Sequence, residues 1–163
     1  MRFAVLAWLA VGIGAAPPCA LAQDDRPTGP QPTLPKQHLT IISAGGVKHP
    51  FDVEVATTPR QQEIGEMFRT LIPADSGMFF DWGAPREVPM WMKNCPVPED
   101  MVFIASDGTI THIAENTVPE SEAVIPSGGQ VRATLELQGG LTEKLGITVG
   151  DKVEGVIFPH IKS

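Results

Sequence analysis

The sequence predicts a mainly β domain, an antiparallel β-sandwich or partly closed barrel of about eight short strands with one or two short helices. Short stretches that alternate apolar and polar residues, or that are apolar throughout, recur along the chain, and both patterns are typical of strands. Turn residues such as Asp-Gly, Gly-Gly and Pro separate most of these stretches. Because strands seldom alternate with helical patterns, the order of elements argues against a parallel sheet.

Two segments carry the clearest strand pattern. In 51–57 the apolar residues alternate with Asp52 and Glu54, so one face is expected to be buried and the other exposed. In 131–137 every second residue is apolar and is expected to point inward, while the residues between them, Glu136 included, are expected to point outward. Asp107-Gly108 predicts a tight hairpin turn, because this pair supplies positive φ angles. The remaining strands are expected at 38–43, 77–82, 88–93, 100–105, 109–114 and 152–158, with a further short strand at 122–125.

One helix is expected to begin at Thr58 and to end before Pro73. Thr58 can cap the first turn, Pro59 suits the first helical position, and Gln61 stands where a capping-box partner belongs. These three positions together predict where the helix begins.

Apolar residues then give this helix one buried face. Ile64, Met67 and Phe68 follow the i, i+3, i+4 spacing of an apolar stripe. Gly65 costs about 1 kcal/mol relative to Ala inside a helix, and a close approach of the helix to the sheet is expected to explain it. A second, shorter helix is expected at 141–145.

Residues 1–22 have the order of a secretory signal peptide. Arg2 is followed by an apolar run over 3–16 and then by Ala20-Leu21-Ala22, a small-x-small cleavage pattern. The run is shorter than the ~20 apolar residues that a membrane-spanning helix needs. Cleavage after Ala22 is therefore expected, with retention as an N-terminal anchor as the alternative. The chain is expected to be exported, to a periplasm or to the extracellular space, and not to span a membrane after cleavage.

The rest of the chain divides at about residue 37. Residues 23–37 contain four prolines and no apolar period, which predicts a disordered or polyproline-like tether. Residues 38–163 are expected to form a single β-rich domain. After cleavage Cys95 is the one cysteine left, so the domain must depend on its hydrophobic core rather than on a disulfide. The net charge of −7 argues against nucleic acid and anionic membrane surfaces as partners.

Six short motifs are spread over most of this domain. They are Val55-Ala56-Thr57-Thr58-Pro59, Gly65-Glu66-Met67-Phe68-Arg69, Gly77-Met78-Phe79-Phe80, Trp91-Met92-Lys93-Asn94, Asp100-Met101-Val102-Phe103-Ile104 and Gly150-Asp151. With them the chain resembles domain-of-unknown-function family 192, over about residues 40–158. The resemblance implies a small β-sandwich or barrel that is often exported, and it implies no particular activity. The chain departs from the family pattern at Glu66 and Glu99, where apolar residues are usual, and at Cys95, where Thr is usual.

The stretch from Trp91 to Asp100 holds the densest set of binding groups in the sequence. Trp91 and Lys93 share a strand face by the two-residue period, while Asn94 and Asp100 flank a corner that is stiffened by two prolines. A flat aromatic ring beside a cation, an amide and a carboxylate can bind a sugar, a peptide end or a small anion. In the alternative interpretation Trp91 belongs to the core, Lys93 pairs with Asp100, and Asn94 shapes a turn.

Arg69 and Glu136 complete the predicted ligand site. Arg69 stands at the expected end of the helix, and Glu136 on the expected outward face of its strand. Both side chains are charged and long enough to reach a ligand held by the Trp91 stretch. The predicted ligand is a small polar molecule or an envelope component.

Other chemistries lack a complete set of residues. Cys95 as a nucleophile would need His112 or His49 as its base, and no Cys-His signature is present. A metal site built on His112 and Glu115 lacks further ligands at a recognisable spacing, so neither a metal nor another cofactor is predicted. The five methionines that follow the signal peptide are spread over several strands and are expected to fill the core.

These residues favour a non-enzymatic, exported binding or accessory domain. One alternative is an envelope hydrolase or transferase with Asp100 as base and Lys93 or Arg69 as electrostatic stabiliser. The other is a purely structural protein-interaction module with an exposed apolar patch. No catalytic residue is assigned, because no nucleophile stands in a recognisable elbow or triad.

Overall fold

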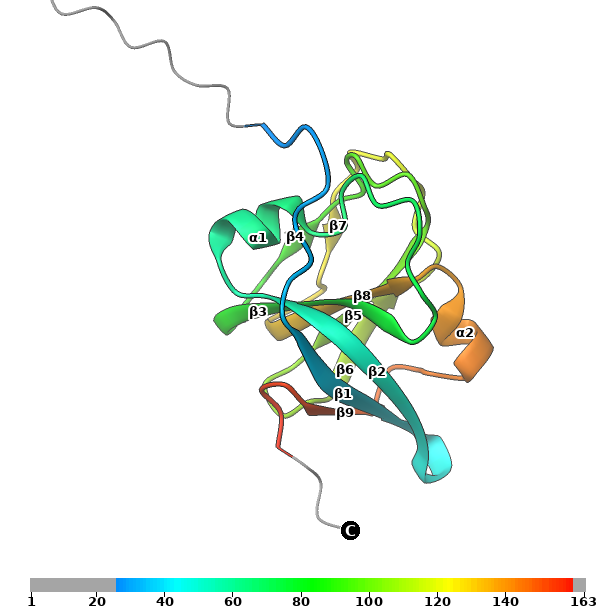
Figure 1. Ribbon diagram of the computed structural model, residues 1–163. Helices are drawn as coiled ribbons and strands as arrows, with labels where there is room; N and C mark the ends of the chain where they lie inside the picture. The colour runs from blue at the N-terminus through cyan, green and yellow to red at the C-terminus, as the bar shows by residue number, and fades with distance from the viewer. Residues whose placement is uncertain (1–25, 160–163) are drawn as a thin grey trace, which may run out of the picture.

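The structure, a computed structural model, describes residues 26–159. A strongly curled sheet has the strand order β6-β5-β8-β3-β2-β1-β9, and a small sheet of β4 and β7 lies above it in Figure 1. The strands are β1 (Lys36–Ser43), β2 (Val47–Ala56), β3 (Ser76–Arg86), β4 (Pro89–Met90), β5 (Glu99–Ile104), β6 (Ile110–Ala114), β7 (Ile125–Pro126), β8 (Val131–Gln138) and β9 (Lys152–Gly155). The helices are α1 (Pro59–Ile64), α2 (Leu141–Leu145) and the 3-10 turn η1 (Ala44–Gly46). The predicted mainly β class is confirmed.

The two edges of the curled sheet meet over a short stretch. Thr109, directly before β6, pairs with Lys152 at the start of β9. The Ile110 amide donates a hydrogen bond to the Asp151 carbonyl at 2.9 Å. These contacts satisfy backbone groups that free edge strands would leave unpaired. Of the two expected architectures, the structure has the partly closed barrel.

The curled sheet is mixed rather than antiparallel, which corrects one part of the prediction. β2 and β3 run parallel, with Val53 opposite Gly77 and Ala56 opposite Phe80. The other adjacent pairs in this sheet are antiparallel. Parallel neighbours need a crossover connection, and the segment that contains α1 provides it. The sequence predicted a helix between these two strands, but one helix among many strands did not indicate that its neighbours run parallel.

Residues that point into the barrel form the main core. A row of Val55, Phe79, Leu135 and Val102 crosses β2, β3, β8 and β5 in register, and all four side chains are buried in one cluster. Leu141 from α2 belongs to the same cluster, so this helix covers one end of the barrel. Of the four β8 residues that were predicted to point inward, Ala133, Leu135 and Leu137 belong to this cluster. Val131 is buried in the second cluster instead.

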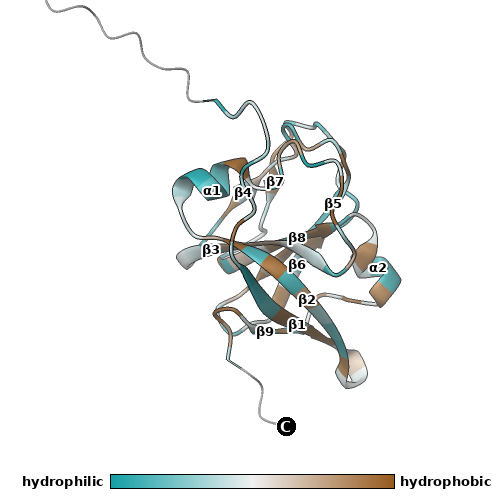
Figure 2. Cartoon of the chain, in the orientation of Figure 1, coloured by the Kyte–Doolittle hydropathy of each residue, from teal (hydrophilic) through white to brown (hydrophobic). Residues whose placement is uncertain are grey.

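The outer face of the same strands carries a second core. The next row along these strands, one position from the inward-facing row, consists of Glu54, Met78, Glu136 and Met101 on β2, β3, β8 and β5. The long connection between β3 and β5 covers this face (Figure 1), and bands of apolar and polar residues alternate along β2 (Figure 2). Glu54 and Glu136 are therefore only 5% and 4% exposed. This corrects the expectation that both side chains point to solvent.

Helix α1 begins as predicted and ends earlier. The Gln61 amide donates to Thr58 Oγ1 at 3.3 Å, and the Thr58 amide donates to Gln61 Oε1 at 3.0 Å, which completes a capping box. The helix ends at Ile64 because Gly65 adopts φ 51° and ψ −132°, a conformation that favours glycine. The expected close approach to the sheet is present, since a Cβ on Gly65 would lie 3.0 Å from Phe80 Cζ. The rest of the predicted apolar stripe lies beyond the helix.

Part of the Pro-rich segment predicted as a tether (23–37) lies against the domain. Gln31 Nε2 donates to the Gly65 carbonyl at 2.9 Å. Leu34 is buried, and its amide donates to Glu54 Oε2 at 2.7 Å. A single leucine among prolines carries no periodic pattern, so these contacts are not visible in the sequence.

Three expected strands are shorter in the structure. The strand expected at 88–93 is reduced to β4, the one expected at 122–125 to β7, and the one expected at 152–158 to β9. Pro89 cannot donate a ladder hydrogen bond, which confines this segment to a short edge pairing. The predicted hairpin between β5 and β6 is confirmed, with Gly108 at φ 79° in its turn.

The signal peptide predicted at 1–22 lies outside the described residues. Within the part of the chain that the structure describes, no helix is long and apolar enough to cross a membrane. The helices there are instead short segments that cap the barrel or connect its strands.

Candidate functional site

Trp91, Lys93 and Asn94, three of the six predicted site residues, lie together in the loop after β4. Trp91 is 43% exposed, and Lys93 Nζ lies 5.1 Å from the centroid of its ring, a cation–π arrangement. Lys93 Nζ also lies 3.5 Å from Glu122 Oε1. The ammonium group is therefore held between an aromatic ring and a carboxylate, and it does not pair with Asp100.

Asn94 fixes the path of this loop. It adopts φ 57°, a left-handed conformation that asparagine tolerates better than most residues. Its carbonyl accepts a hydrogen bond from the Phe68 amide at 2.7 Å, and its Nδ2 lies 3.7 Å from Met67 Sδ. The loop that carries Trp91 is therefore fastened to the segment that follows α1.

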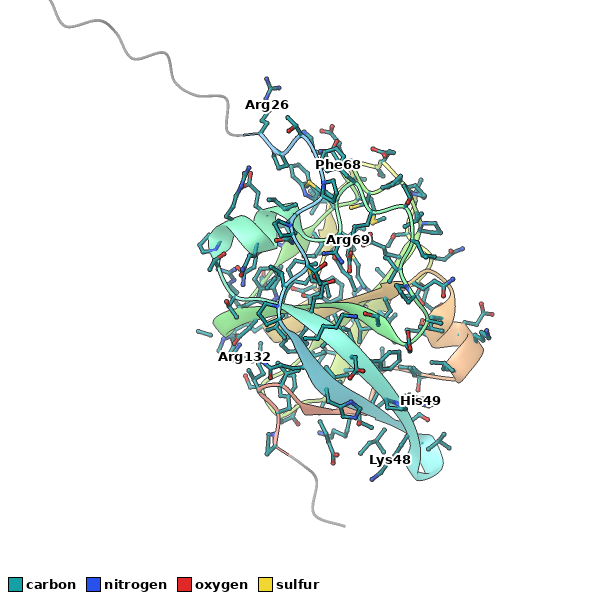
Figure 3. All side chains as sticks on the ribbon, viewed as in Figure 1. Arg26, Lys48, His49, Phe68, Arg69 and Arg132 are labelled. Atoms are coloured by element: carbon teal, nitrogen blue, oxygen red, sulfur yellow. The ribbon has the colours of Figure 1, made fainter. Side chains whose placement is uncertain are left out.

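Lys93 and Asn94 line a cavity of about 510 Å³, here called the Lys93 pocket. Trp91 forms part of its wall, and so do residues 26–28 of the N-terminal segment. In Figure 3, Arg26 and Phe68 lie at the same end of the molecule, on the side of the sheet that carries α1. The N-terminal segment is thus a structural part of this pocket.

Asp100, the fourth predicted residue of the Trp91 stretch, serves another purpose. It is fully buried, and Oδ1 accepts hydrogen bonds from the amides of Asn116 and Gly140 at 2.7 and 2.8 Å. Oδ2 accepts from the amide and the hydroxyl of Thr142 at 2.8 and 2.7 Å. The carboxylate fastens β5 to the start of α2, so its oxygens are occupied by the fold.

Arg69 is also engaged within the protein. Its two terminal nitrogens donate to Glu54 Oε1 and Oε2 at 2.7 and 2.9 Å, the bidentate geometry that strengthens Arg–carboxylate pairs. Burial acts to raise the pKa of Glu54, but the hydrogen bonds from Arg69 and from the Leu34 amide outweigh it and lower the pKa. Arg69 lies between the sheet and the segment of Phe68 in Figure 3. It therefore supports the site from behind and lines neither cavity.

Glu136, the last predicted residue, lines a second cavity of about 510 Å³, here called the glutamate pocket. Glu66 and Cys95 line it as well. Its apolar walls include Phe80, Trp82, Met90 and Trp91. Because Glu63, Met67 and Trp91 line both cavities, the two pockets adjoin, with the Trp91 ring at their boundary.

The aromatic wall of the glutamate pocket is fixed in place. Trp82 Nε1 donates to Thr134 Oγ1 at 3.0 Å, and the Trp82 ring stacks on Phe80 with centroids 5.5 Å apart. Arg86 lies 4.9 Å from the centroid of Trp82, a second cation–π contact. The pocket therefore presents preformed aromatic surface rather than mobile side chains.

Three buried glutamates define the chemistry of this region: Glu66, Glu99 and Glu136. Glu99 is fully buried, and apart from the weak donor of the Cys95 thiol its carboxylate oxygens have no hydrogen-bond partner. Oε2 of Glu136 likewise has none. Arg69 Nε lies 3.0 Å from Glu66 Oε2, but no N–H is aimed at that oxygen as a hydrogen bond. Buried polar groups are normally satisfied, so these oxygens are exceptional.

Burial raises the pKa of all three carboxyl groups. It raises the pKa of Glu66 to about 7 and that of Glu99 to about 8, against an ordinary value of 4.5. The pKa of Glu136 is raised by burial and by the charges of Glu99 and Glu66. Arg69 acts in the opposite direction on each of them. Near neutral pH the fold therefore retains protons on carboxyl groups that would be ionised in water.

Sequence reasoning did not assign Glu66 or Glu99 to the site. A signal was present, because both acids stand where the resemblance leads one to expect apolar residues, and Cys95 is the third such departure. The structure brings the three departures together: the charges of Glu99 and Glu66 both act on the Cys95 thiol. An acid at a position that is usually apolar indicates a buried carboxyl group, and this signal could have identified Glu66 and Glu99.

Cys95 is not arranged as a nucleophile. Burial and then the charge of Glu99 raise the pKa of its thiol well above the ordinary value, whereas the thiolate is the reactive form. His49 bonds instead to Ser43, and His112 stacks on a phenylalanine ring. Neither histidine lines the pocket that Cys95 lines.

The methionines that follow the signal peptide gather in one place. Met67, Met78, Met90, Met92 and Met101 all belong to the second core. They come from several strands and connecting segments, and their predicted role as core filler fits this position. Among residues 26–159, no group of three or more His, Cys, Asp or Glu side chains is arranged to hold a metal ion.

Asp100→Asn is expected to destabilise the fold by about 2–4 kcal/mol, because an amide nitrogen would face buried N–H donors that now share a carboxylate. Urea unfolding of the variant checks this. Asp75→Asn, at an exposed position, is the matched control and is expected to be near neutral. Equal stability of Asp100→Asn and wild type would contradict the assigned role.

The stability of the protein is expected to fall as the pH rises from 4.5 toward 8. The folded chain retains the Glu99 proton up to a pKa of about 8, while the unfolded chain releases it near 4.5. Over that pH range each retained proton lowers the free energy of unfolding by about 1.4 kcal/mol per pH unit. Glu99→Gln removes this titration, so its free energy of unfolding should fall less steeply with pH and exceed that of the wild type near pH 8. Unfolding across this range checks it, with the exposed Glu143→Gln as control, and an unchanged slope would contradict the assignment.

The family model of domain-of-unknown-function family 192, described as "Uncharacterized ACR", matches residues 40–155. A solved structure from Sinorhizobium meliloti 1021, provisionally described as a transcription regulator, is 47% identical with a TM-score of 0.75, over 77% of this chain and 97% of that one. A protein of unknown function from Novosphingobium aromaticivorans DSM 12444 is 39% identical with a TM-score of 0.72, over 74% of this chain and 86% of that one. No curated protein matches the chain. The extent of these matches shows that the chain belongs to domain-of-unknown-function family 192.

Proposed function

We propose that this protein is an exported, non-enzymatic domain that binds a small polar molecule in the cleft formed by the Lys93 pocket and the glutamate pocket. One observation carries the proposal: Trp91, 43% exposed, stands at the boundary of two cavities of about 510 Å³ each. Cavities of this size are typical of small-molecule sites, which combine apolar walls with a few polar groups. An exposed tryptophan in such a place supplies a flat face for a ligand.

The geometry around Trp91 supports a preformed site. Lys93 lies over the ring and close to Glu122, and the Asn94 carbonyl is bonded to the Phe68 amide. A ligand that enters the cleft would therefore meet groups that are already in position. Preorganised groups lose little conformational entropy on binding.

The catalytic alternatives lack an available group. The hydrolase interpretation needs Asp100 as a base, and both of its oxygens accept hydrogen bonds from the fold. A nucleophilic Cys95 would need a thiolate, which burial disfavours. A role in transcription regulation, the description given to the Sinorhizobium protein, has no electrostatic support in this chain, because its net charge of −7 disfavours binding to DNA.

Export rests on the N-terminal pattern, Arg2 followed by an apolar run and Ala20-Leu21-Ala22. The full chain, expressed in a Gram-negative host, is expected to appear in the periplasmic fraction with Gln23 as its first residue. N-terminal sequencing checks this. A chain that begins at Gln23 is the control and should stay in the cytoplasm. Recovery of the uncleaved chain in the cytoplasm would contradict export.

Ligand binding is tested by screening the mature chain against a library of amines, amino acids, sugars, carboxylates and nucleotides. A ligand at ten times its Kd should stabilise the wild type by about 1.4 kcal/mol, seen as a rise in Tm. For any compound that raises the Tm of the wild type, Lys93→Ala and Trp91→Ala should abolish the rise. The Tm of each variant without ligand should change little, because both side chains are partly exposed.

Lys48→Ala is the matched control for this screen. It removes the same charge at the hairpin tip, far from Arg26 and Phe68 in Figure 3, so ligand binding should be unchanged. If no compound raises the Tm of the wild type, or if Trp91→Ala binds equally well, the cleft is not a ligand site. A protein-interaction module would then be the better interpretation.

A further inference from the structure

We propose that the glutamate pocket recognises an organic cation, a molecule with an ammonium or guanidinium group on an apolar stem, whose charge pairs with Glu136 and Glu66. The inference rests on the proposed function, since it names the class of ligand that the cleft takes. It depends on the unpaired carboxylate oxygens, on the charges around them and on the walls of the cavity.

Glu136 presents an unpartnered acceptor to the cavity. The residue is 4% exposed and lines the glutamate pocket, and its Oε2 has no hydrogen-bond partner. The Glu66 backbone donates a hydrogen bond to the same carboxyl group, so the unused bonding capacity is that of Oε2. Gly65 lies beside this oxygen, since a Cβ at that position would stand 3.5 Å from it. A buried carboxylate oxygen without a partner is costly, and a donor group on a ligand would satisfy it.

Acidic side chains outnumber basic ones in the glutamate pocket. Glu63, Glu66, Glu87 and Glu136 line it, against the single cation Arg86. The nearest cation behind the pocket, Arg69, has both terminal nitrogens bound to Glu54. Its remaining nitrogen lies at ion-pair distance from Glu66 and gives no hydrogen bond to Glu136 Oε2. The lining therefore holds carboxyl groups that a bound cation would favour in their ionised form and pair with.

The walls of the glutamate pocket suit a cation on an apolar stem. Trp82 and Trp91 line it with aromatic surface, and Phe80 and Met90 add apolar surface. Aromatic faces attract cations, and apolar walls bind a hydrocarbon stem. A cavity of about 510 Å³ suits an organic molecule. The described side chains also hold no group with the geometry of a metal site, which favours an organic cation over a metal ion.

Cation binding would replace protons. Without a cation, burial raises the pKa of Glu66 to about 7 and also raises that of Glu136. An ammonium group beside these carboxyls would favour their ionised forms, so each carboxylic acid that ionises releases its proton to the buffer. Binding should then be accompanied by proton release near pH 6, and by less release above the raised pKa values.

The test uses three probes of similar shape: 2-phenylethylammonium, 2-phenylethanol and 3-phenylpropionate. Binding to the mature chain is followed by the fluorescence of Trp82 and Trp91, which both line the pocket, and by calorimetry in buffers of different ionisation enthalpy. The ammonium probe should bind the wild type about tenfold or more tightly than the alcohol, with proton release. Glu136→Gln should lose this preference and release fewer protons, while its affinity for the alcohol is unchanged.

Two controls separate this inference from the proposed function. Glu143→Gln, on the exposed side of α2, should leave all three affinities unchanged, and Trp91→Ala should weaken all three alike. Equal binding of the three probes, a preference for the carboxylate, or an undiminished preference in Glu136→Gln would overturn the cation inference and leave the cleft intact. If none of the three probes binds, the cation inference is also overturned. The proposed function would then depend on whether a non-cationic compound of the library binds in the cleft.

Discussion

The burial of both faces of the central strands is the constraint on which this structure depends. Inward-facing residues of β3, β8 and β5 fill the barrel, and outward-facing residues of the same strands lie beneath the β3–β5 connection. A charged residue on either face is therefore removed from water, wherever it falls in the alternation. Glu54, Glu136 and Asp100 are all in this position. Each must be paired, hydrogen-bonded or neutralised by a proton.

The three acids meet this constraint in different ways. Glu54 has a bidentate arginine and a backbone amide, and Asp100 has four donors from the loops that it joins. Glu136 has an oxygen with no partner at all. The first two are structural groups whose bonding is complete in the free protein. The third retains unused bonding capacity at the wall of a cavity, which is the property that distinguishes a binding group from a structural one.

Much of the fold could be predicted from local patterns. The capping box at Thr58 and the Asp-Gly hairpin each depend on neighbouring residues, and the structure confirms both. The alternation along β8 predicted the inward position of Ala133, Leu135 and Leu137, but not the burial of the residues between them. The parallel β2–β3 pair could not be predicted, because it depends on a short crossover. The burial of Leu34 escaped prediction for a similar reason: its partner, Glu54, is twenty residues away in the sequence.

The candidate site was harder to predict because a sequence pattern assigns a side chain to a face but does not show what covers that face. Trp91, Lys93 and Asn94 are close in the chain, and the structure keeps them together. Asp100 follows only a few residues later in the chain, yet its carboxylate bonds to Thr142 at the start of α2. The apolar runs 78–80 of β3 and 101–104 of β5 indicate that both faces of the sheet are buried there. Since β8 lies between those two strands, an acid at one of its outward positions is buried as well. Glu136 is that acid, and its burial beside a cavity makes it a binding group.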